Sequence, residues 1–123
     1  MINERLTTML RVEWRKCMLR SRCRLNLINL TNEYFNDLVG IYIIWSERDI
    51  KKTIYIGRGI IRNELNQMKL DSEVQRYGSD LFVTWAEIPT VSLDGVEAFL
   101  YKELNPMIKD NILCLDLINV NLP

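Results

Sequence analysis

The sequence predicts an α+β domain built on a small three-stranded antiparallel sheet flanked by helices. Two short runs rich in β-branched and aromatic residues, 40–45 and 53–57, are separated by a charged interval, which is typical of a β-hairpin. A third run, 81–87, alternates in the manner of a strand. Segments 60–69 and 94–104 have helical spacing of apolar residues. Helices interleaved with one hairpin and one further strand favour a layered α+β architecture.

Length and composition indicate one folded domain. The chain has 123 residues, 48% of them hydrophobic, with 16 basic and 16 acidic side chains. Without a repeat or a clear linker, residues 1–37 are interpreted as an N-terminal helix and connection packed on a domain formed by residues 38–123. No apolar run approaches the roughly 18 residues of a membrane span, and charged residues occupy the N-terminus. We therefore expect no membrane partner and a cytoplasmic, intracellular location.

Cysteine and histidine usage restricts the possible chemistry. Cys17, Cys23 and Cys114 are odd in number and lack metal-site spacing, so we expect neither a disulfide framework nor a zinc site, and three reduced thiols. Histidine is absent from the sequence, which removes the usual general base. Catalysis must therefore use tyrosine, carboxylate, lysine or a metal ion.

The first 24 residues are strongly basic. They carry a net charge of +5, so residues 25–123 carry −5. Apolar residues spaced by three and four predict a helix over residues 3–24 with one apolar and one basic face. These apolar residues are Leu6, Met9, Leu10, Trp14, Cys17 and Met18. Two interpretations stay open: a helix that covers the sheet, with solvated arginines, or a basic arm for nucleic acid or an acidic protein partner.

The elements after this helix follow from local signals. Residues 25–37 contain many capping and turn residues and predict a connection with one helical turn. After the hairpin, Arg58 and Gly59 are expected in a short turn. Helix 60–69 is expected to bury Ile61, Leu65 and Met68.

The second half of the chain is interpreted in the same way. Asp71 or Ser72 can cap a short helix that Gly78 ends. Pro89 stops the strand at 81–87, and Asn105-Pro106 closes the helix that Asp94 begins, because proline cannot continue a helix. The remaining residues are apolar enough to pack as an extended tail.

Each strand of the predicted hairpin carries a tyrosine close to a glycine. Gly40-Ile41-Tyr42 opens the first strand, and Tyr55-Ile56-Gly57 closes the second. A residue without a side chain leaves room for a substrate beside the tyrosine hydroxyl.

These two tripeptides resemble both halves of the signature of the GIY-YIG nuclease superfamily. The order of elements also resembles that family, including a helix that carries Glu97 and a proline, Pro106, shortly downstream. The resemblance covers about residues 38–111. It implies a metal-dependent endonuclease that hydrolyses phosphodiester bonds of DNA with Mg²⁺ or Mn²⁺.

The resemblance also implies roles for individual residues. Tyr42 and Tyr55 would orient or deprotonate the attacking water, and Glu97 would bind the metal ion. Arg58 would stabilise the charge of the transition state. The residues expected to bind substrate are Gly57, Gly59, Arg62 and Asn111.

Two family positions are replaced in this chain. Glu64 and Met68 stand where the family has an arginine and a histidine, so Arg58 is the better substitute for that arginine, and Arg62 should face elsewhere on the helix. The alternative to a weak endonuclease is a catalytically degenerate fold that binds nucleic acid or protein, or a purely structural subunit.

Structural explanations compete with each of these roles. Tyr42 and Tyr55 are common sheet residues, which pack across strands. Asp94 and Glu97 have the spacing of a capping box at a helix start. The glycines can serve a tight turn, and Arg58 and Arg62 can be solvated surface charges.

Overall fold

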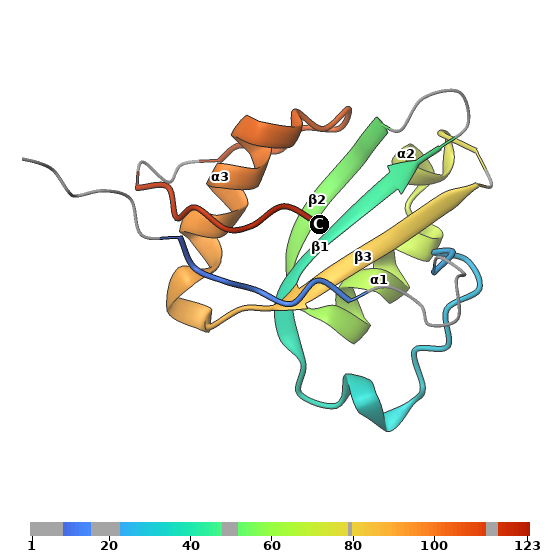
Figure 1. The fold of residues 1–123 in the computed structure, drawn as a ribbon. Coiled ribbons are helices and arrows are strands. Elements are labelled where there is room, and N and C mark those ends of the chain that lie inside the picture. Colours follow the sequence, from blue (N-terminus) through green and yellow to red (C-terminus); the bar gives the residue numbers. More distant parts are fainter. Residues whose placement is uncertain (1–8, 16–22, 48–51, 79, 113–115) are drawn as a thin grey trace, which may run out of the picture.

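The computed structural model describes residues 9–15, 23–47, 52–78, 80–112 and 116–123. Its architecture is α+β, with a three-stranded antiparallel sheet between two layers of helices, as expected (Figure 1). The elements in chain order are the 3-10 helix η1 (Glu33–Phe35), β1 (Val39–Ser46), β2 (Lys52–Ile60), α1 (Ile61–Leu70), α2 (Ser72–Gln75), β3 (Leu81–Glu87), the 3-10 helix η2 (Thr90–Ser92) and α3 (Leu93–Leu104).

The predicted hairpin is confirmed and forms the centre of the sheet. The strand order is β2-β1-β3, and β1 pairs antiparallel with both neighbours. Tyr42 of β1 lies opposite Gly57 of β2 on one side and Trp85 of β3 on the other. β2 runs to Ile60, so Arg58 and Gly59 lie within this strand and the predicted turn at these residues is wrong.

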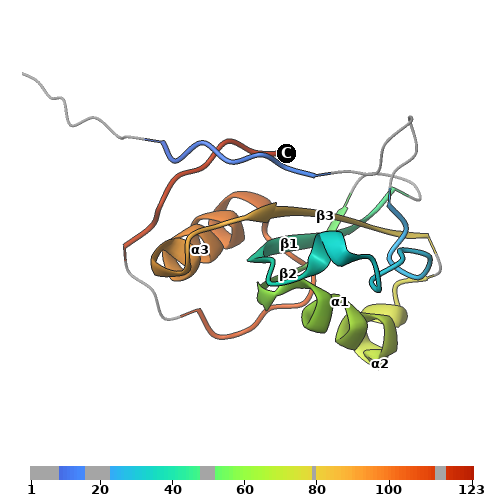
Figure 2. The same cartoon turned by 90° about the horizontal axis from the view of Figure 1, so that it is seen from below.

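Two apolar clusters hold the helices against opposite faces of the sheet. Tyr42 and Ile44 face the cluster that includes Leu65 of α1, whereas Ile41 and Ile43 face the cluster that includes Leu100 of α3. The alternation follows from strand geometry, in which successive side chains point to opposite faces. Figure 2 shows α3 on one side of the strands and α1 with α2 on the other.

The helices agree closely with the sequence prediction. Ile61, Leu65 and Met68 are the buried residues of α1. The Asp71 carboxylate accepts a hydrogen bond from the Val74 amide and so caps α2. The helix α3 ends at Leu104, and its C-cap Asn105 has a φ of 46°, in the left-handed region. Its predicted capping box is wrong, because the N-cap is Ser92 and Asp94 lies in the first turn.

The predicted N-terminal helix is wrong for the described residues 9–15, which are extended. Leu10, Val12 and Trp14 are partly buried and the residues between them are exposed, a period of two. The same apolar residues fit both the two-residue period of a strand and the spacing of a helix. Hydrogen bonds to distant segments of the chain favour the extended conformation. Residues 3–8 and 16–22 of the predicted helix lie outside the described residues.

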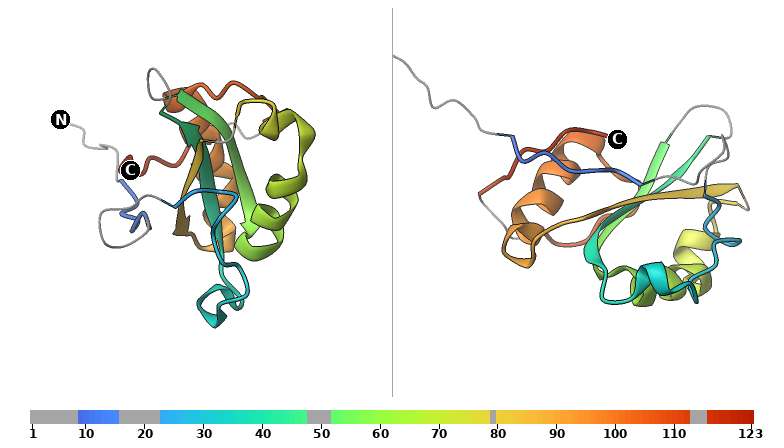
Figure 3. Two further views of the ribbon diagram at one scale, coloured as in Figure 1. Left: turned by 90° about the vertical axis from the view of Figure 1, so that its right-hand side faces the viewer. Right: turned by 60° about the horizontal axis from the view of Figure 1, so that its bottom comes forward.

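The partners of this segment are β3 and the end of the chain. Leu10 donates from its amide to the Asn119 carbonyl at 2.8 Å, and Arg15 and Trp85 exchange backbone hydrogen bonds. The Asn121 side chain bonds both the amide and the carbonyl of Val12. Figure 3 shows the two terminal segments running beside each other.

Cys23 is disulfide-bonded, so the expectation of three reduced cysteines is wrong. None of the helices in the described part of the chain combines the length and apolar character needed to cross a membrane.

Candidate active site

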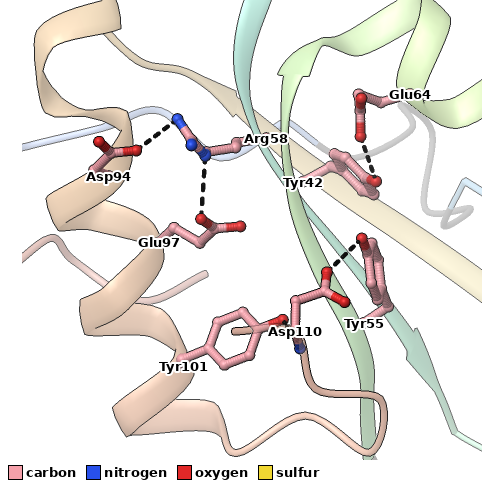
Figure 4. Close-up of polar contacts among 8 residues, drawn as sticks. All are labelled: Tyr42, Tyr55, Arg58, Glu64, Asp94, Glu97, Tyr101 and Asp110. Carbon is pink, nitrogen blue, oxygen red and sulfur yellow. Dashed lines mark hydrogen bonds and ion pairs between the residues drawn. The ribbon is translucent and has the colours of Figure 1, made fainter. Parts of the chain in front are cut away.

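The residues expected to be catalytic lie around β2, one of the two edge strands of the sheet (Figure 4). Gly57 and Arg58 follow each other on this strand, opposite Tyr42 and Ile41 of β1 respectively. Because neighbouring strand residues point to opposite faces, Arg58 lies on the α3 face and Tyr42 on the α1 face. The site therefore has an α1 side, formed by Tyr42, Gly57 and Glu64, and an α3 side, formed by Arg58, Asp94, Glu97, Tyr101 and Asp110.

The α1 side is closed. Tyr42 has no exposed surface, and its hydroxyl donates a hydrogen bond to Glu64 Oε1 at 2.9 Å. A Cβ atom at Gly57 would come within 2.2 Å of the Tyr42 hydroxyl oxygen. The space that Gly57 provides is therefore filled by the Tyr42 ring rather than left open for a substrate. Gly59 has a φ of 135°, a conformation that favours glycine.

Tyr55 packs against the apolar cluster on the α1 face and is half-buried. Its ring centroid is 6.0 Å from that of Tyr42, and the two rings are tilted by 42°. The Tyr55 hydroxyl donates a hydrogen bond to Asp110 Oδ2 at 3.0 Å. The two tyrosines therefore lie side by side while their hydroxyls bond carboxylates on different sides of the site (Figure 4).

The α3 side carries the arginine. Arg58 Nη1 is 2.6 Å from Asp94 Oδ1, and Arg58 Nε is 3.1 Å from Glu97 Oε1. The Arg58 side chain is 43% exposed, whereas that of Glu97 is 13% exposed. Arg58 thus covers Glu97 from the solvent side, and Glu97 pairs with this arginine instead of capping its own helix.

Burial and neighbouring charges raise the pKa values of the main groups. Burial raises the pKa of the Tyr42 hydroxyl, and the Glu64 carboxylate raises it further. Burial followed by Asp110 raises the pKa of Tyr55. Burial also raises the pKa of Glu97, where Arg58 opposes the shift and Asp110 and Asp94 add to it. Both tyrosines are therefore held in their neutral forms at physiological pH.

Negative charge predominates at the site. The residues drawn in Figure 4 include four carboxylates, those of Glu64, Asp94, Glu97 and Asp110, and one cation, Arg58, which pairs with Asp94 and Glu97. Mg²⁺ in proteins takes one or two carboxylates and keeps several waters, and this donor set fits such an ion at Glu97. The described residues contain no group of three or more His, Cys, Asp or Glu side chains that could enclose a metal ion.

Two residues expected to bind substrate lie apart from these contacts. The Arg62 guanidinium donates to the Leu30 and Asn32 carbonyls and to the Asn36 side chain, so it fixes the connection before β1. Arg62 therefore faces elsewhere, as its position on the helix predicts. Asn111 is exposed in the segment after α3. Met68 is buried in the apolar cluster under α1.

Three residues of the site were missed by sequence reasoning. Asp94 was considered only as a cap, and Tyr101 and Asp110 were not considered. Their spacing on α3 gave a signal for two of them, because Asp94, Glu97 and Tyr101 recur at three and four residues and share one helix face. The position of Asp110 depends on a loop that folds back on β2, which has no local signal.

Comparisons of the chain with protein-family models, with curated proteins and with solved structures found no match.

Proposed function

We propose that this chain is a GIY-YIG-type endonuclease that hydrolyses phosphodiester bonds of DNA with Mg²⁺ or Mn²⁺. The observation that supports it best is the contact between Arg58 of β2 and Glu97 of α3, beside the strand that also carries Tyr55 (Figure 4). Tyrosine, arginine and glutamate are the residue types that the resemblance requires; Tyr55 and Arg58 belong to β2, and Glu97 belongs to α3.

The proposed roles follow from exposure and charge. Glu97 would hold the ion, which when bound would supply Lewis-acid polarisation of the scissile phosphate. Arg58 is exposed enough to turn from its two carboxylates towards a phosphate oxygen, where its fork of donors suits the charge of the transition state. Tyr55 would orient the attacking water, because its side chain is half-buried and its hydrogen bond to Asp110 is exposed. Tyr42 would hold the Tyr55 ring in place by packing against it.

A second candidate function is a binding module without catalysis. The observation that favours it is the excess of carboxylates over Arg58, which repels a phosphate when no divalent cation is bound. The basic N-terminal segment gives limited compensation among its described residues, because Arg15 pairs with Glu13 at 2.9 Å and Arg24 lies 3.4 Å from Asp80.

Nicking of supercoiled plasmid DNA tests the proposed function. The wild-type chain should nick with Mg²⁺ or Mn²⁺ and stop when EDTA is added, and Glu97→Gln should lower the rate by about 100-fold or more. Asp80→Asn is the matched control, since it removes an exposed carboxylate at the start of β3. Nicking that persists in Glu97→Gln would refute the proposal. Binding of labelled duplex without any nicking would favour the binding module.

A further inference from the structure

The segment after α3 folds back along the edge of β2. The Met107 amide donates to the Thr53 carbonyl at 3.0 Å, and the Ile108 amide donates to the Ile54 carbonyl at 2.9 Å. Asp110 follows two residues later and is thereby placed beside Tyr55, the next residue of the same strand. The backbone of this segment is fixed to the strand that carries the tyrosine.

Asp110 itself contacts two tyrosines. Its carboxylate accepts from the Tyr55 hydroxyl, and its amide donates to the Tyr101 hydroxyl oxygen at 3.2 Å. Tyr101 belongs to α3, so Asp110 connects this helix with β2 (Figure 4). An ionised carboxylate can only accept hydrogen bonds, and the Tyr55 hydroxyl must therefore be the donor.

In this direction the Tyr55 hydroxyl oxygen can still accept a hydrogen bond from another donor. Tyr42 has a similar bond to Glu64 but no exposed surface, so water cannot reach its hydroxyl without rearrangement. Tyr55 is half-buried and its hydrogen bond to Asp110 is exposed, so water can reach its hydroxyl. The two tyrosines of the signature are thus unequal, and Asp110 is the partner of the accessible one.

We propose that Asp110 is a positioning residue that acts through Tyr55, an inference that rests on the proposed function. Water donates a proton to Tyr55 Oη while Tyr55 passes its own proton to Asp110 Oδ2. The water oxygen bonds to phosphorus, and the bond between phosphorus and the leaving sugar oxygen breaks with its electron pair on that oxygen. The leaving oxygen takes a proton from solvent. Tyr55 stays neutral before and after the step.

The contact is tested without any activity measurement. 3,5-Difluorotyrosine, which titrates at lower pH than tyrosine, is placed at position 55 and titrated by ¹⁹F NMR. Asp110→Asn should lower its pKa, because the change removes a negative charge that opposes ionisation of the ring hydroxyl. The control Asp80→Asn should leave the pKa of this fluorinated tyrosine unchanged. An unchanged titration in Asp110→Asn overturns the inference.

A double-mutant cycle tests the catalytic part in the nicking assay. Asp110→Asn should lower kcat about 10- to 100-fold with little change in KM, and should have no further effect in a Tyr55→Phe background. Tyr77→Phe is the control for loss of a tyrosine hydroxyl. If the fold-losses in kcat of the two single variants multiply in the double variant, the role of Asp110 is overturned and the proposed function still holds.

The wild-type chain and Glu97→Gln separate the two claims. A wild-type chain that does not nick overturns both the proposed function and the proposed proton transfer from Tyr55 to Asp110. Nicking that requires Glu97 but is insensitive to Asp110→Asn overturns only the proton transfer from Tyr55 to Asp110. Circular dichroism of each variant confirms that the comparison is made between folded chains.

Discussion

The two sides of the site contain similar residues in different physical states. On the α1 side, Tyr42 is fully buried and bonded to Glu64, and its ring fills the space above Gly57. On the α3 side, Arg58 and Asp94 are exposed and Glu97 lies beneath them. The first arrangement stabilises the hairpin and the second can exchange partners with a ligand. A tyrosine in the signature is therefore not by itself a catalytic tyrosine.

Charge distinguishes the two sides as well. The α1 side carries one carboxylate and no cation among its three residues, whereas Arg58 partly neutralises the carboxylates of the α3 side. If chemistry occurs in this protein, we expect it on the α3 side and at Tyr55. Substitutions on the α1 side should instead change stability or the background electrostatic potential.

The largest effect is expected for Arg58→Gln. Removal of the site's cation should lower the nicking rate about 100- to 1,000-fold, the usual cost of losing a group that stabilises the transition state. The same variant should bind Mn²⁺ more tightly, because the Glu97 carboxylate no longer forms an ion pair with Arg58. Arg76→Gln, an exposed arginine after α2, is the control. Weaker Mn²⁺ binding in Arg58→Gln would contradict the competition between Arg58 and the ion.

Gly57→Ala should destabilise the fold by about 1–3 kcal/mol, because the new methyl group collides with the Tyr42 ring. Urea unfolding measures the loss. The cost should be smaller in a Tyr42→Leu background, where the ring is absent. An equal cost in both backgrounds would show that the collision with Tyr42 is not the cause.

The pH dependence of stability should reveal the burial of Glu97. Its pKa is raised above the ordinary value of 4.5, so the folded chain holds this proton more tightly than the unfolded chain does. The wild-type chain should therefore gain stability relative to Glu97→Gln as pH falls from 7 towards 4.5, and lose it as pH rises. Urea unfolding of both chains at several pH values gives this difference. A difference that moves in the opposite direction would contradict the raised pKa.

The smallest effect is expected for Glu64→Gln. Glutamine keeps an oxygen that can accept from the Tyr42 hydroxyl and removes one negative charge near an incoming phosphate. Nicking should rise by about two- to fivefold at low ionic strength, and the gain should shrink in high salt because screening weakens the repulsion. Glu73→Gln in α2 is the control. A loss of activity would show that Glu64 has a positive role in the reaction.

Local patterns predicted the central elements of the fold. The hairpin, α1 and β3 follow from apolar periodicity and turn residues within each segment. Residues 9–15 were assigned wrongly because Leu10, Val12 and Trp14 fit either period, and their partner Asn121 is more than 100 residues away in sequence. Long-range pairing decided what the local pattern left ambiguous.

The sequence likewise predicted part of the candidate site. The sequence predicted Arg58 as a site residue, and strand alternation explains why it faces α3 and Glu97, whereas its catalytic role stays a prediction. It did not identify Asp110, whose place depends on the backbone pairing of Met107 and Ile108 with β2. Residues placed by a loop that folds back on a strand cannot be located from spacing.

Calorimetric titration with Mn²⁺ tests the central claim most directly. The wild-type chain should bind one ion, Glu97→Gln should weaken its affinity at least 10-fold, and Glu64→Gln should retain it. This result would locate the metal chemistry on the α3 side. Absence of binding, or equal weakening by the two variants, would contradict the division of the site into a structural and a chemical side.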